Sequence, residues 1–282
     1  MTTATAKPAR VSIHPTAIIS PESQLGDGVD IGPWCVLTGQ VTLGANTRLL
    51  ANVQIAGPVT IGESCTLYPF VCIGFPPQDF KFKPGDPTAG VVVGSHTVLR
   101  ESVTLHAATK LDKPTRVGDR VYMMASSHAG HDAAVGNGVV MANSAMLAGH
   151  STVFDNAILS GNSAVHQFNR VGRMAFVTGN VGTAMDIPPF CVCALRNTIS
   201  TVNLVGLRRA GYPREHITAV RNAFWHVFRR NLTRKDTIAE LTARGQDCPL
   251  VLEQAEFVAT AVRPIARGGM GSGTLEPVEG DG

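Results

Sequence analysis

Four histidines in the middle of the chain are the residues best suited to acid–base chemistry: His128, His131, His150 and His166. Imidazole titrates near pH ~6.5, so it can accept and return a proton at neutral pH. Asp132 directly follows His131, and a neighbouring carboxylate can fix the tautomer of an imidazole and raise its basicity. His131 is therefore a candidate general base. A water-exposed histidine without function is the competing interpretation.

The elements that carry these histidines repeat every six residues. An aliphatic residue, Met or Ala opens nearly every block: Ile13, Ile19, Leu25, Ile31, Leu37, Leu43, Leu49, Ile55, Ile61, Leu67 and Ile73, and again Val117, Met123, Ala129, Val135, Met141, Leu147, Val153, Leu159, Val165, Val171 and Val177. This period fits neither an α-helix, near ~3.6, nor a half-buried strand, at ~2. It predicts a parallel β-helix whose opening residues point inward. Gly26-Asp27-Gly28, Gly44-Ala45-Asn46 and Gly136-Asn137-Gly138 are expected at corners, where positive φ or bonds from side chain to backbone are useful.

The repeat brings a second group of residues to the candidate base. Three blocks make one coil, so Gly149, 18 residues after His131, falls beside it in the next coil, followed by His150. A base next to a glycine N–H donor suits acyl transfer, because attack on a carbonyl creates an oxyanion that the donor can stabilise.

Two stretches break the repeat, and helical spacing follows it. We expect helices at 213–228, 237–244 and 249–262. The predicted organisation is a disordered N-terminus at 1–12, a β-helix at 13–186 with excursions at 75–92 and 107–116, a helical domain at 187–264 and a disordered tail at 265–282. Long loops on a rigid scaffold commonly serve binding or subunit contacts.

Composition narrows the class of protein. The chain of 282 residues is 44% hydrophobic and 16% charged, as in globular proteins with an ample core. A net charge of +3 without an aromatic-plus-basic motif argues against nucleic acid. The six cysteines lack CxxC spacing, so neither zinc nor disulfides are expected. Without an apolar signal segment or a run of ~20 apolar residues, we expect a cytoplasmic protein with no transmembrane segment.

Several motifs carry a resemblance to a known family: Arg100-Glu101-Ser102-Val103-Thr104-Leu105-His106, His128-Ala129-Gly130-His131-Asp132, Leu147-Ala148-Gly149-His150 and Ala164-Val165-His166-Gln167-Phe168. With the hexads and the helical C-terminus, they make residues 13–262 resemble the UDP-N-acetylglucosamine O-acyltransferases. The resemblance implies a left-handed parallel β-helix with a C-terminal α-helical domain. It also implies a homotrimer with active sites between subunits, and neither metal nor bound cofactor.

The family's reaction begins lipid A biosynthesis. An R-3-hydroxyacyl group passes from the phosphopantetheine of acyl carrier protein to the 3-hydroxyl of UDP-N-acetylglucosamine. On the matching positions of this sequence, His131 is implied as the general base, Asp132 as the carboxylate that orients it, and the Gly149 N–H as the oxyanion donor. The sugar oxygen would attack the thioester directly.

The resemblance also implies residues that bind the substrates. Asp79 and Lys81 match positions for the sugar and the 3-hydroxyl region of the acyl chain, and Gly179 matches the position that sets chain length. His106, His128, His150, His166 and Gln167 would line the cleft, with Asn203 and Arg209 near the nucleotide and its phosphates. Acyl carrier proteins are acidic, so the arginine-rich C-terminal segment is a candidate docking surface.

The sequence departs from the family pattern at several positions. Ala210 follows Arg209 where a second basic residue is familiar, so part of the phosphate contact is weaker or comes from elsewhere. Phe75-Pro76-Pro77 replaces a more polar run, and Phe176 and Asn180 differ around the chain-length pocket, so acyl length stays open.

Three alternatives stay open as well. A related UDP-sugar N-acyltransferase would carry a further N-terminal domain, whereas the hexads here start at Ile13. A zinc carbonic anhydrase on the same fold would bind metal through three histidines at subunit interfaces. A non-enzymatic repeat scaffold would keep all its functions after replacement of His131.

Overall fold

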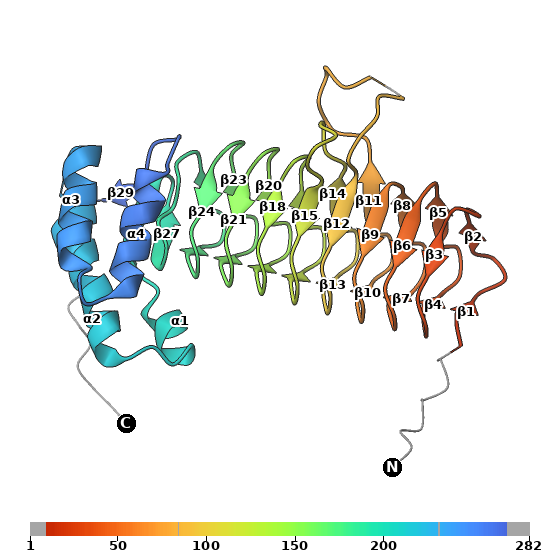
Figure 1. Ribbon diagram of the computed structural model, residues 1–282, viewed down its shortest axis with the longest axis horizontal. Helices are drawn as coiled ribbons and strands as arrows, with labels where there is room; N and C mark the ends of the chain where they lie inside the picture. The colour runs from red at the N-terminus through yellow and green to blue at the C-terminus, as the bar shows by residue number, and fades with distance from the viewer. Residues whose placement is uncertain (1–9, 84, 231, 270–282) are drawn as a thin grey trace, which may run out of the picture.

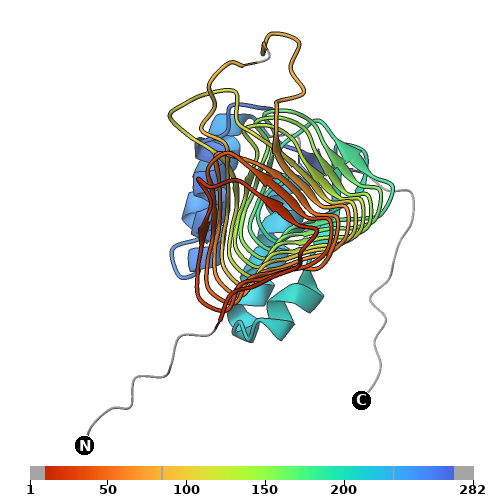
Figure 2. The ribbon, with the colours of Figure 1, turned by 90° about the vertical axis from the view of Figure 1, so that its right-hand side faces the viewer.

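The computed structural model describes residues 10–83, 85–230 and 232–269. Most of them form a rod of short strands, and helices close one end of the rod (Figure 1). Seen along its axis, the rod is a triangular prism whose sides are three β-sheets (Figure 2). Residues 1–9 of the predicted N-terminus and 270–282 of the predicted tail lie outside the described residues.

Consecutive strands of the rod belong to different sheets, because the chain turns a corner after each strand. The twelve-strand sheet contains β1 (Ser12–Ile13), β4 (Asp30–Ile31), β7 (Arg48–Leu49), β10 (Thr66–Leu67), β13 (Val98–Leu99), β16 (Tyr122–Met123), β19 (Val140–Met141), β22 (Ile158–Leu159), β25 (Phe176–Val177), β27 (Cys191–Leu195), β28 (Thr198–Val202) and β29 (Arg267–Gly268). The nine-strand sheet contains β2 (Ile18–Ile19), β5 (Val36–Thr38), β8 (Gln54–Ala56), β11 (Cys72–Phe75), β14 (Thr104–His106), β17 (His128–Ala129), β20 (Met146–Leu147), β23 (Ala164–Val165) and β26 (Gly182–Thr183). The eight-strand sheet contains β3 (Gln24–Leu25), β6 (Val41–Leu43), β9 (Val59–Ile61), β12 (Val91–Val93), β15 (Thr115–Val117), β18 (Ala134–Val135), β21 (Thr152–Val153) and β24 (Arg170–Val171).

Strand partners lie one coil apart. Ser12 pairs with Asp30 and Met146 pairs with Ala164, both in parallel register and both 18 residues apart. Where an excursion interrupts a coil, the partners are further apart in sequence but the register returns, as between Thr104 and His128. This is the parallel β-helix that the hexads predict.

The residues that open the hexads form the core. From Ile31 to Val177 each of them is buried, whereas Ile13, at the free end of the rod, is 48% exposed. Each fully buried Leu or Ile contributes roughly 1.5–3 kcal/mol relative to an exposed one. The inward ladders therefore stabilise the rod and leave its outer faces and corners for chemistry.

Most corners place one residue in the left-handed backbone region. The last residue of each predicted corner triplet, Gly28, Asn46 and Gly138, has positive φ. Asp132, His150 and Phe168 also do, with φ of 59°, 58° and 64°. Bulky residues seldom adopt such angles, whereas glycine does so at no steric cost. One edge of the rod thus carries an acid, an imidazole and a phenyl ring in three successive coils.

The two excursions project from the same part of the rod (Figure 1). They span residues 76–90, between β11 and β12, and 107–114, between β14 and β15, slightly less than predicted. The carbonyl of Gly90 accepts hydrogen bonds from the N–H groups of Ala108 and Thr115, and the Ala89 N–H donates to the Lys110 carbonyl. The excursions therefore brace each other.

The helical domain follows the rod. It contains α1 (Leu204–Arg209), α2 (Arg214–Ala223), the π-helix η1 (Phe224–Phe228), α3 (Arg234–Arg244) and α4 (Pro249–Ala259). The predicted helix at 213–228 corresponds to α2 and η1, and the other two predicted helices correspond to α3 and α4. Pro249 is tolerated at the start of α4 because the first helical N–H needs no partner within the helix.

Two predicted boundaries are wrong. The helical domain is expected from 187, but β27 and β28 form a hairpin that continues the twelve-strand sheet. The disordered tail is expected from 265, but Ile265 bridges to Asp186 and β29 pairs with β28. From Cys191 to Ala194 in β27, buried and partly exposed residues alternate. A period of two replaces the period of six there, so loss of the hexads did not mean loss of the sheet.

A buried carboxylate fastens the helical domain to the rod. Asp186 is fully buried and accepts hydrogen bonds from the Arg170 Nε at 2.7 Å and backbone N–H at 2.8 Å. Arg170 also donates to the Phe257 carbonyl of α4 at 2.7 Å. The Asp186 backbone bonds to Pro264 and Ala266. The segment that follows α4 is thereby held against the rod.

Candidate active site

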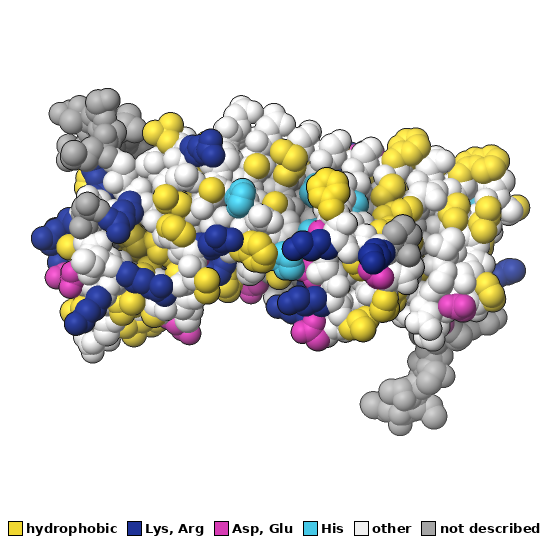
Figure 3. All heavy atoms as spheres, turned by 90° about the horizontal axis from the view of Figure 1, so that it is seen from above, with side chains coloured by type: hydrophobic (Ala, Val, Ile, Leu, Met, Phe, Trp, Pro, Cys, Tyr) yellow, Lys and Arg dark blue, Asp and Glu magenta, His cyan; other side chains and the backbone are white. Residues whose placement is uncertain are grey.

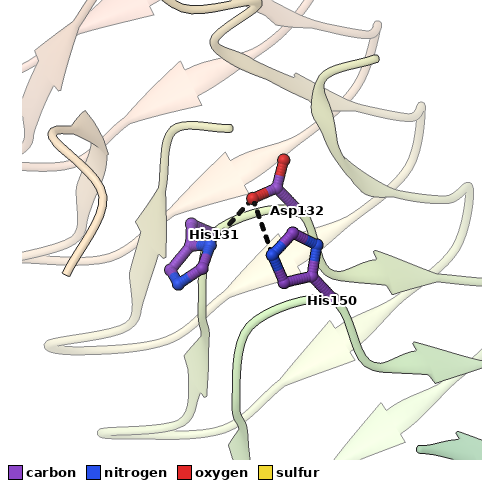
Figure 4. Close-up of side chains that lie close together, drawn as sticks. All are labelled: His131, Asp132 and His150. Atoms are coloured by element: carbon purple, nitrogen blue, oxygen red, sulfur yellow. Dashed lines mark hydrogen bonds and ion pairs between the residues drawn. The ribbon is translucent and has the colours of Figure 1, made fainter. Parts of the chain in front are cut away.

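His131 and Asp132 form a hydrogen-bonded pair at the corner after β17. Nδ1 of His131 lies 2.8 Å from Oδ2 of Asp132, and the two side chains are 14% and 10% exposed (Figure 4). An ionised carboxylate only accepts hydrogen bonds, so Nδ1–H is the donor and Nε2 keeps its lone pair. A neutral imidazole held in this tautomer can take a proton at Nε2.

Asp132 is kept ionised by its donors. Burial opposes ionisation, but hydrogen bonds from His131 and Thr109 outweigh it and lower the pKa of the carboxyl group. Thr109 donates from its backbone N–H at 3.1 Å and from its hydroxyl at 2.8 Å. The Asp132 N–H donates to the hydroxyl of Thr115 at 2.8 Å. The second excursion therefore contributes directly to the site, because it supplies Thr109.

Gly149 lies against the imidazole, one coil along. A Cβ at Gly149 would come within 2.5 Å of Cε1 and 2.6 Å of Nε2 of His131. Only glycine therefore leaves room for this position of the ring. The predicted adjacency of His131 and Gly149 is confirmed.

The N–H of Gly149 is an available donor. In the described part of the chain it has no hydrogen-bond partner. At another edge of the rod the equivalent N–H groups are capped from the next coil: Asp119 donates to Oδ1 of Asn137, and Asn137 to Oδ1 of Asp155, both at 2.8 Å. Gln167 occupies the capping position for Gly149 and makes no such contact with it within the described residues. The donor is left free beside the candidate base.

His150 stands on the other side of the carboxylate. Its Nε2 lies 3.6 Å from Oδ2 of Asp132, and its ring meets that of His131 edge-on, with centroids 5.1 Å apart. It also stacks on Phe168, with centroids 4.6 Å and planes 6° apart. Burial lowers the pKa of His150, against the opposing effect of the Asp132 charge, and so favours the neutral ring.

A cleft of about 990 Å³ opens beside the pair. The predicted site residues that line it are His128, His131, Gly149, His166, Gln167 and Gly179. Much of the remaining lining is apolar or lacks a side chain, including Met146, Ala164 and Gly182, which continue the row begun by His128 on successive strands. The cleft thus combines an apolar row along the rod with polar groups that include the histidines, Asn180, Thr183 and Arg196.

Known proteins that are similar to this chain are acyltransferases. A family model described as UDP N-acetylglucosamine O-acyltransferase, domain 2, matches residues 186–266. An acyl-[acyl-carrier-protein]–UDP-N-acetylglucosamine O-acyltransferase from Thermodesulfovibrio yellowstonii is 42% identical over 257 residues, which is 90% of this chain and 99% of the relative. The chain belongs to the UDP-N-acetylglucosamine O-acyltransferase family.

Solved structures of this O-acyltransferase family have the same architecture. The Francisella novicida UDP-N-acetylglucosamine acyltransferase superimposes with a TM-score of 0.87 at 31% identity, covering 90% of this chain and 94% of that one. The structure from Moraxella catarrhalis RH4 gives 0.85 at 33% identity, covering 90% and 99%. The predicted fold class, a left-handed parallel β-helix with a C-terminal α-helical domain, is confirmed.

His106 and His128 lie on neighbouring strands of the O-acyltransferase rod, with ring centroids 5.4 Å apart. Nδ1 of His106 donates to the Pro76 carbonyl at 2.8 Å, and Nδ1 of His128 lies 2.7 Å from the hydroxyl of Thr104. Burial lowers the pKa of His128 to about 4, and the neighbouring histidines act in the same direction. His128 is therefore a neutral hydrogen-bonding group at neutral pH.

Some residues that the family resemblance assigns to substrate lie outside the cleft lining. Asp79 accepts a hydrogen bond from the Lys81 N–H at 2.9 Å in the first excursion, and its charge still acts on His150. Asn203 caps α1: its Oδ1 accepts from the Gly206 N–H and its Nδ2 donates to the Met174 carbonyl, both at 2.9 Å. Arg209 lies in the last turn of the same helix. Their contacts with substrate stay predictions.

Three further site residues were not predicted from the sequence. Nothing in the excursion distinguishes Thr109 as the donor that returns to Asp132, and Thr115 reads only as the start of a strand. Phe168 belongs to one of the family motifs, and its distance of 18 residues from His150 could have placed the two rings together. The repeat locates residues in neighbouring coils but says nothing of loops that fold back.

His131, Asp132 and His150 also form a possible metal-binding group. Their ligand atoms lie within 4.8 Å of one another, and no second such group occurs in the described residues. The 2.8 Å separation of Nδ1 and Oδ2 is that of a hydrogen bond, so a divalent metal would have to displace the proton there.

Basic side chains gather over the helical end of the rod, and others lie near the histidines (Figure 3). The sequence of α1 contains Arg208 and Arg209, and that of α2 contains Arg214 and Arg221. An acidic partner would be attracted to such a surface. None of the described helices has the length and apolar character that crossing a bilayer requires.

Proposed function

We propose that this chain transfers an R-3-hydroxyacyl group from acyl carrier protein to the 3-hydroxyl of UDP-N-acetylglucosamine, the first step of lipid A biosynthesis, with His131 as general base. The observation that carries the proposal is the contact of His131 with Asp132 on one side and Gly149 on the other. The names of the relatives, which contain both substrates, support the choice of donor and acceptor.

The arrangement can perform every proton and charge movement of the reaction. The sugar hydroxyl attacks the thioester carbonyl while Nε2 of His131 takes its proton, and the ionised Asp132 stabilises the imidazolium. The Gly149 N–H stabilises the oxyanion of the tetrahedral intermediate. When the C–S bond breaks, the imidazolium returns the proton to the leaving sulfur of the phosphopantetheine. Atoms and charges balance without an acyl-enzyme, metal or cofactor.

The cleft supports the orientation of the substrates. Its polar side chains, among them His128, His166 and Gln167, suit the sugar, and its apolar row along Met146, Ala164 and Gly182 suits an extended acyl chain. Gly179 lines the same cleft without a side chain, which leaves room along the chain path. We propose that a homotrimer covers the exposed side of this cleft and brings Asn203 and Arg209 of neighbouring subunits toward the nucleotide.

The direct test compares wild type with His131→Asn, using R-3-hydroxyacyl carrier proteins of several lengths and UDP-N-acetylglucosamine. A general base contributes about 10²- to 10⁴-fold, so kcat should fall by that order. His96→Asn is the matched control, because His96 is an exposed corner histidine with φ of 57° and a weak 3.8 Å contact to Glu63. If the wild type is inactive, the proposed reaction is wrong. If His131→Asn keeps full activity, His131 is not the general base.

One alternative has an observation in its favour. A zinc hydrase would use the His131, Asp132 and His150 group, whose ligand atoms are close enough to share an ion. It predicts stoichiometric zinc in the purified protein and CO₂ hydration that a chelator abolishes. The acyltransferase predicts acyl transfer that survives the chelator. Replacing the acceptor by a 3-amino sugar nucleotide separates the O-acyltransferase from the N-acyltransferase.

A further inference from the structure

The edge of the rod that holds Asp132 continues as a column of packed side chains. Asp132, His150 and Phe168 occupy the same corner position in three successive coils. The His150 and Phe168 rings are nearly parallel, 6° apart, at a centroid distance of 4.6 Å. His150 also contacts Asp132: its Nε2 lies 3.6 Å from the Oδ2 of that carboxylate. Phe168 therefore packs on His150, and His150 in turn contacts Asp132 and His131.

The column is also supported from the helical domain. The guanidinium carbon of Arg263 lies 5.2 Å from the centroid of the Phe168 ring, within the range of a cation–π contact. The segment after α4 is fastened to the rod by the buried Asp186, which bonds to Pro264 and Ala266. Phe168 thus lies between the guanidinium of Arg263 and the ring of His150.

The backbone at Phe168 is unfavourable for a phenylalanine. Its φ is 64°, a region that bulky residues seldom adopt, and its side chain is 45% exposed. Other corners of the same rod use asparagine at equivalent angles, as at Asn156, Asn162 and Asn180. Asparagine is the less strained choice at such a corner. Trp34 and Phe70 are also exposed corner rings at positive φ, so the backbone strain alone does not single out Phe168. Among these three rings, as the described residues place them, Phe168 is the one that stacks on a histidine.

We propose that Phe168 is a positioning residue for acyl transfer: its ring holds the His150 imidazole against Asp132, and so restricts the carboxylate to the orientation in which it bonds His131. The inference rests on the proposed function and adds a residue to it. Phe168 itself need not touch substrate or the reacting atoms.

The contact works through geometry. The parallel stack leaves His150 little freedom to turn about its χ angles, and its edge-on contact with His131, at 5.1 Å, limits the second ring in turn. Without the phenyl ring, His150 can rotate toward solvent and Asp132 loses one wall of its pocket. An aromatic pair stabilises its arrangement by about two- to tenfold, so the loss in kcat should be of that order.

The test uses two substitutions at Phe168 and one control. Phe168→Asn removes the ring and relieves the backbone strain, so the protein should melt no lower than wild type while kcat falls about two- to tenfold. Phe168→Tyr keeps the stack and should keep kcat. Phe154→Leu removes another partly exposed ring, which packs on Phe257 of α4 away from the histidines, and should leave kcat unchanged. KM should change little in all three, since substrate contacts are retained.

A second measurement does not depend on activity. Phe168 covers one face of His150, and burial lowers the pKa of that imidazole. In an NMR titration of the histidines, Phe168→Asn should raise the His150 pKa toward its ordinary value, and Phe168→Tyr should not. Unchanged kcat in Phe168→Asn would overturn the proposal, whatever the titration shows. A rise in KM alone would also overturn it, because His150 would then be positioned for substrate and not for Asp132.

The same experiment separates this inference from the proposed function. If the wild type transfers no acyl group, the proposed function fails, and the titration alone decides whether Phe168 holds His150. If the wild type is active and Phe168→Asn is equally active, the proposed function stands and the positioning role of Phe168 does not.

Discussion

The imidazole of His131 packs so closely on the backbone of Gly149 that a Cβ at the glycine would lie 2.5 Å from Cε1. This contact joins two coils of the rod at the point where a base and an N–H donor are needed together. It also makes the glycine a sensitive position.

Gly149→Ala should therefore reduce activity strongly without unfolding the rod. The new methyl group keeps the N–H but pushes the imidazole from Asp132 and from the cleft, and a misplacement of about 1 Å can reduce kcat by about 10²-fold. Gly161→Ala is the matched control, because its nearest contact would be the Asn143 carbonyl at 3.5 Å. The measurement is kcat together with thermal melting. Equal activities of the two variants would contradict the tight packing.

Thr109→Val should weaken the hold on Asp132. The hydroxyl donates to the carboxylate at 2.8 Å and helps to lower its pKa. Because ionised Asp132 is the active form, activity is lost as the pH falls through its pKa. The lost bond should reduce kcat/KM by about tenfold or less at pH 7, since the backbone N–H remains. In the pH profile of kcat/KM, the raised pKa of Asp132 should make the further loss of activity in acid steeper than in wild type.

Thr38→Val provides the control for that profile, because the Thr38 hydroxyl contacts only the Ile55 carbonyl, at 3.4 Å, far along the rod. If both variants show the wild-type acidic limb, Thr109 does not act on the carboxylate.

His128 should make the folded protein less stable in acid. Its pKa is about 4 in the folded chain and ~6.5 when unfolded, so between these values the unfolded state binds a proton that the folded state does not. Stability is thus highest above pH ~6.5 and falls as the pH drops toward 4, by roughly 1–3 kcal/mol from this group. Urea unfolding at several pH values measures the slope, which His128→Gln should make shallower. If His128→Gln keeps the wild-type slope, the loss of stability in acid comes from other histidines.

Gly179→Met should shorten the preferred acyl chain. Gly179 lines the cleft, and even a Cβ there would approach the Gly161 carbonyl to 3.3 Å, so a longer side chain must turn into the cleft. Competition between acyl carrier proteins of different lengths measures the shift in kcat/KM. The longest chain accepted by wild type should lose most. A uniform loss at all lengths would indicate general damage and not a measuring position.

Much of the fold followed from one period in the sequence. Leu37 and Leu147 lie more than a hundred residues apart, yet the same hexad position predicts the same inward direction for both, and both are buried. The spacing between His131 and Gly149 predicted their contact for the same reason. Because the repeat is regular, the spacing of two residues in the sequence predicts their relative positions in the rod.

The remainder depended on contacts that no period describes. The bond from Thr109 to Asp132 requires the second excursion to fold back on the rod, and a loop path is not encoded by hydrophobic spacing. The hairpin of β27 and β28 has the short alternation of an ordinary strand pair, which is easily taken for irregular chain after a proline pair. Asn203 illustrates a third limit, because an amide that caps a helix looks the same in sequence as one that binds a ligand.

The strict register between coils also restricts how this protein can change in length. Deleting one residue between His131 and Gly149 would rotate every later side chain around the rod axis, separating the base from its donor and turning buried residues outward. Adding or removing an entire coil elsewhere would preserve the angular phase, and changes within 76–90 or 107–114 would leave it untouched. Natural variation and protein engineering should therefore alter the rod in whole turns and confine other insertions to its loops.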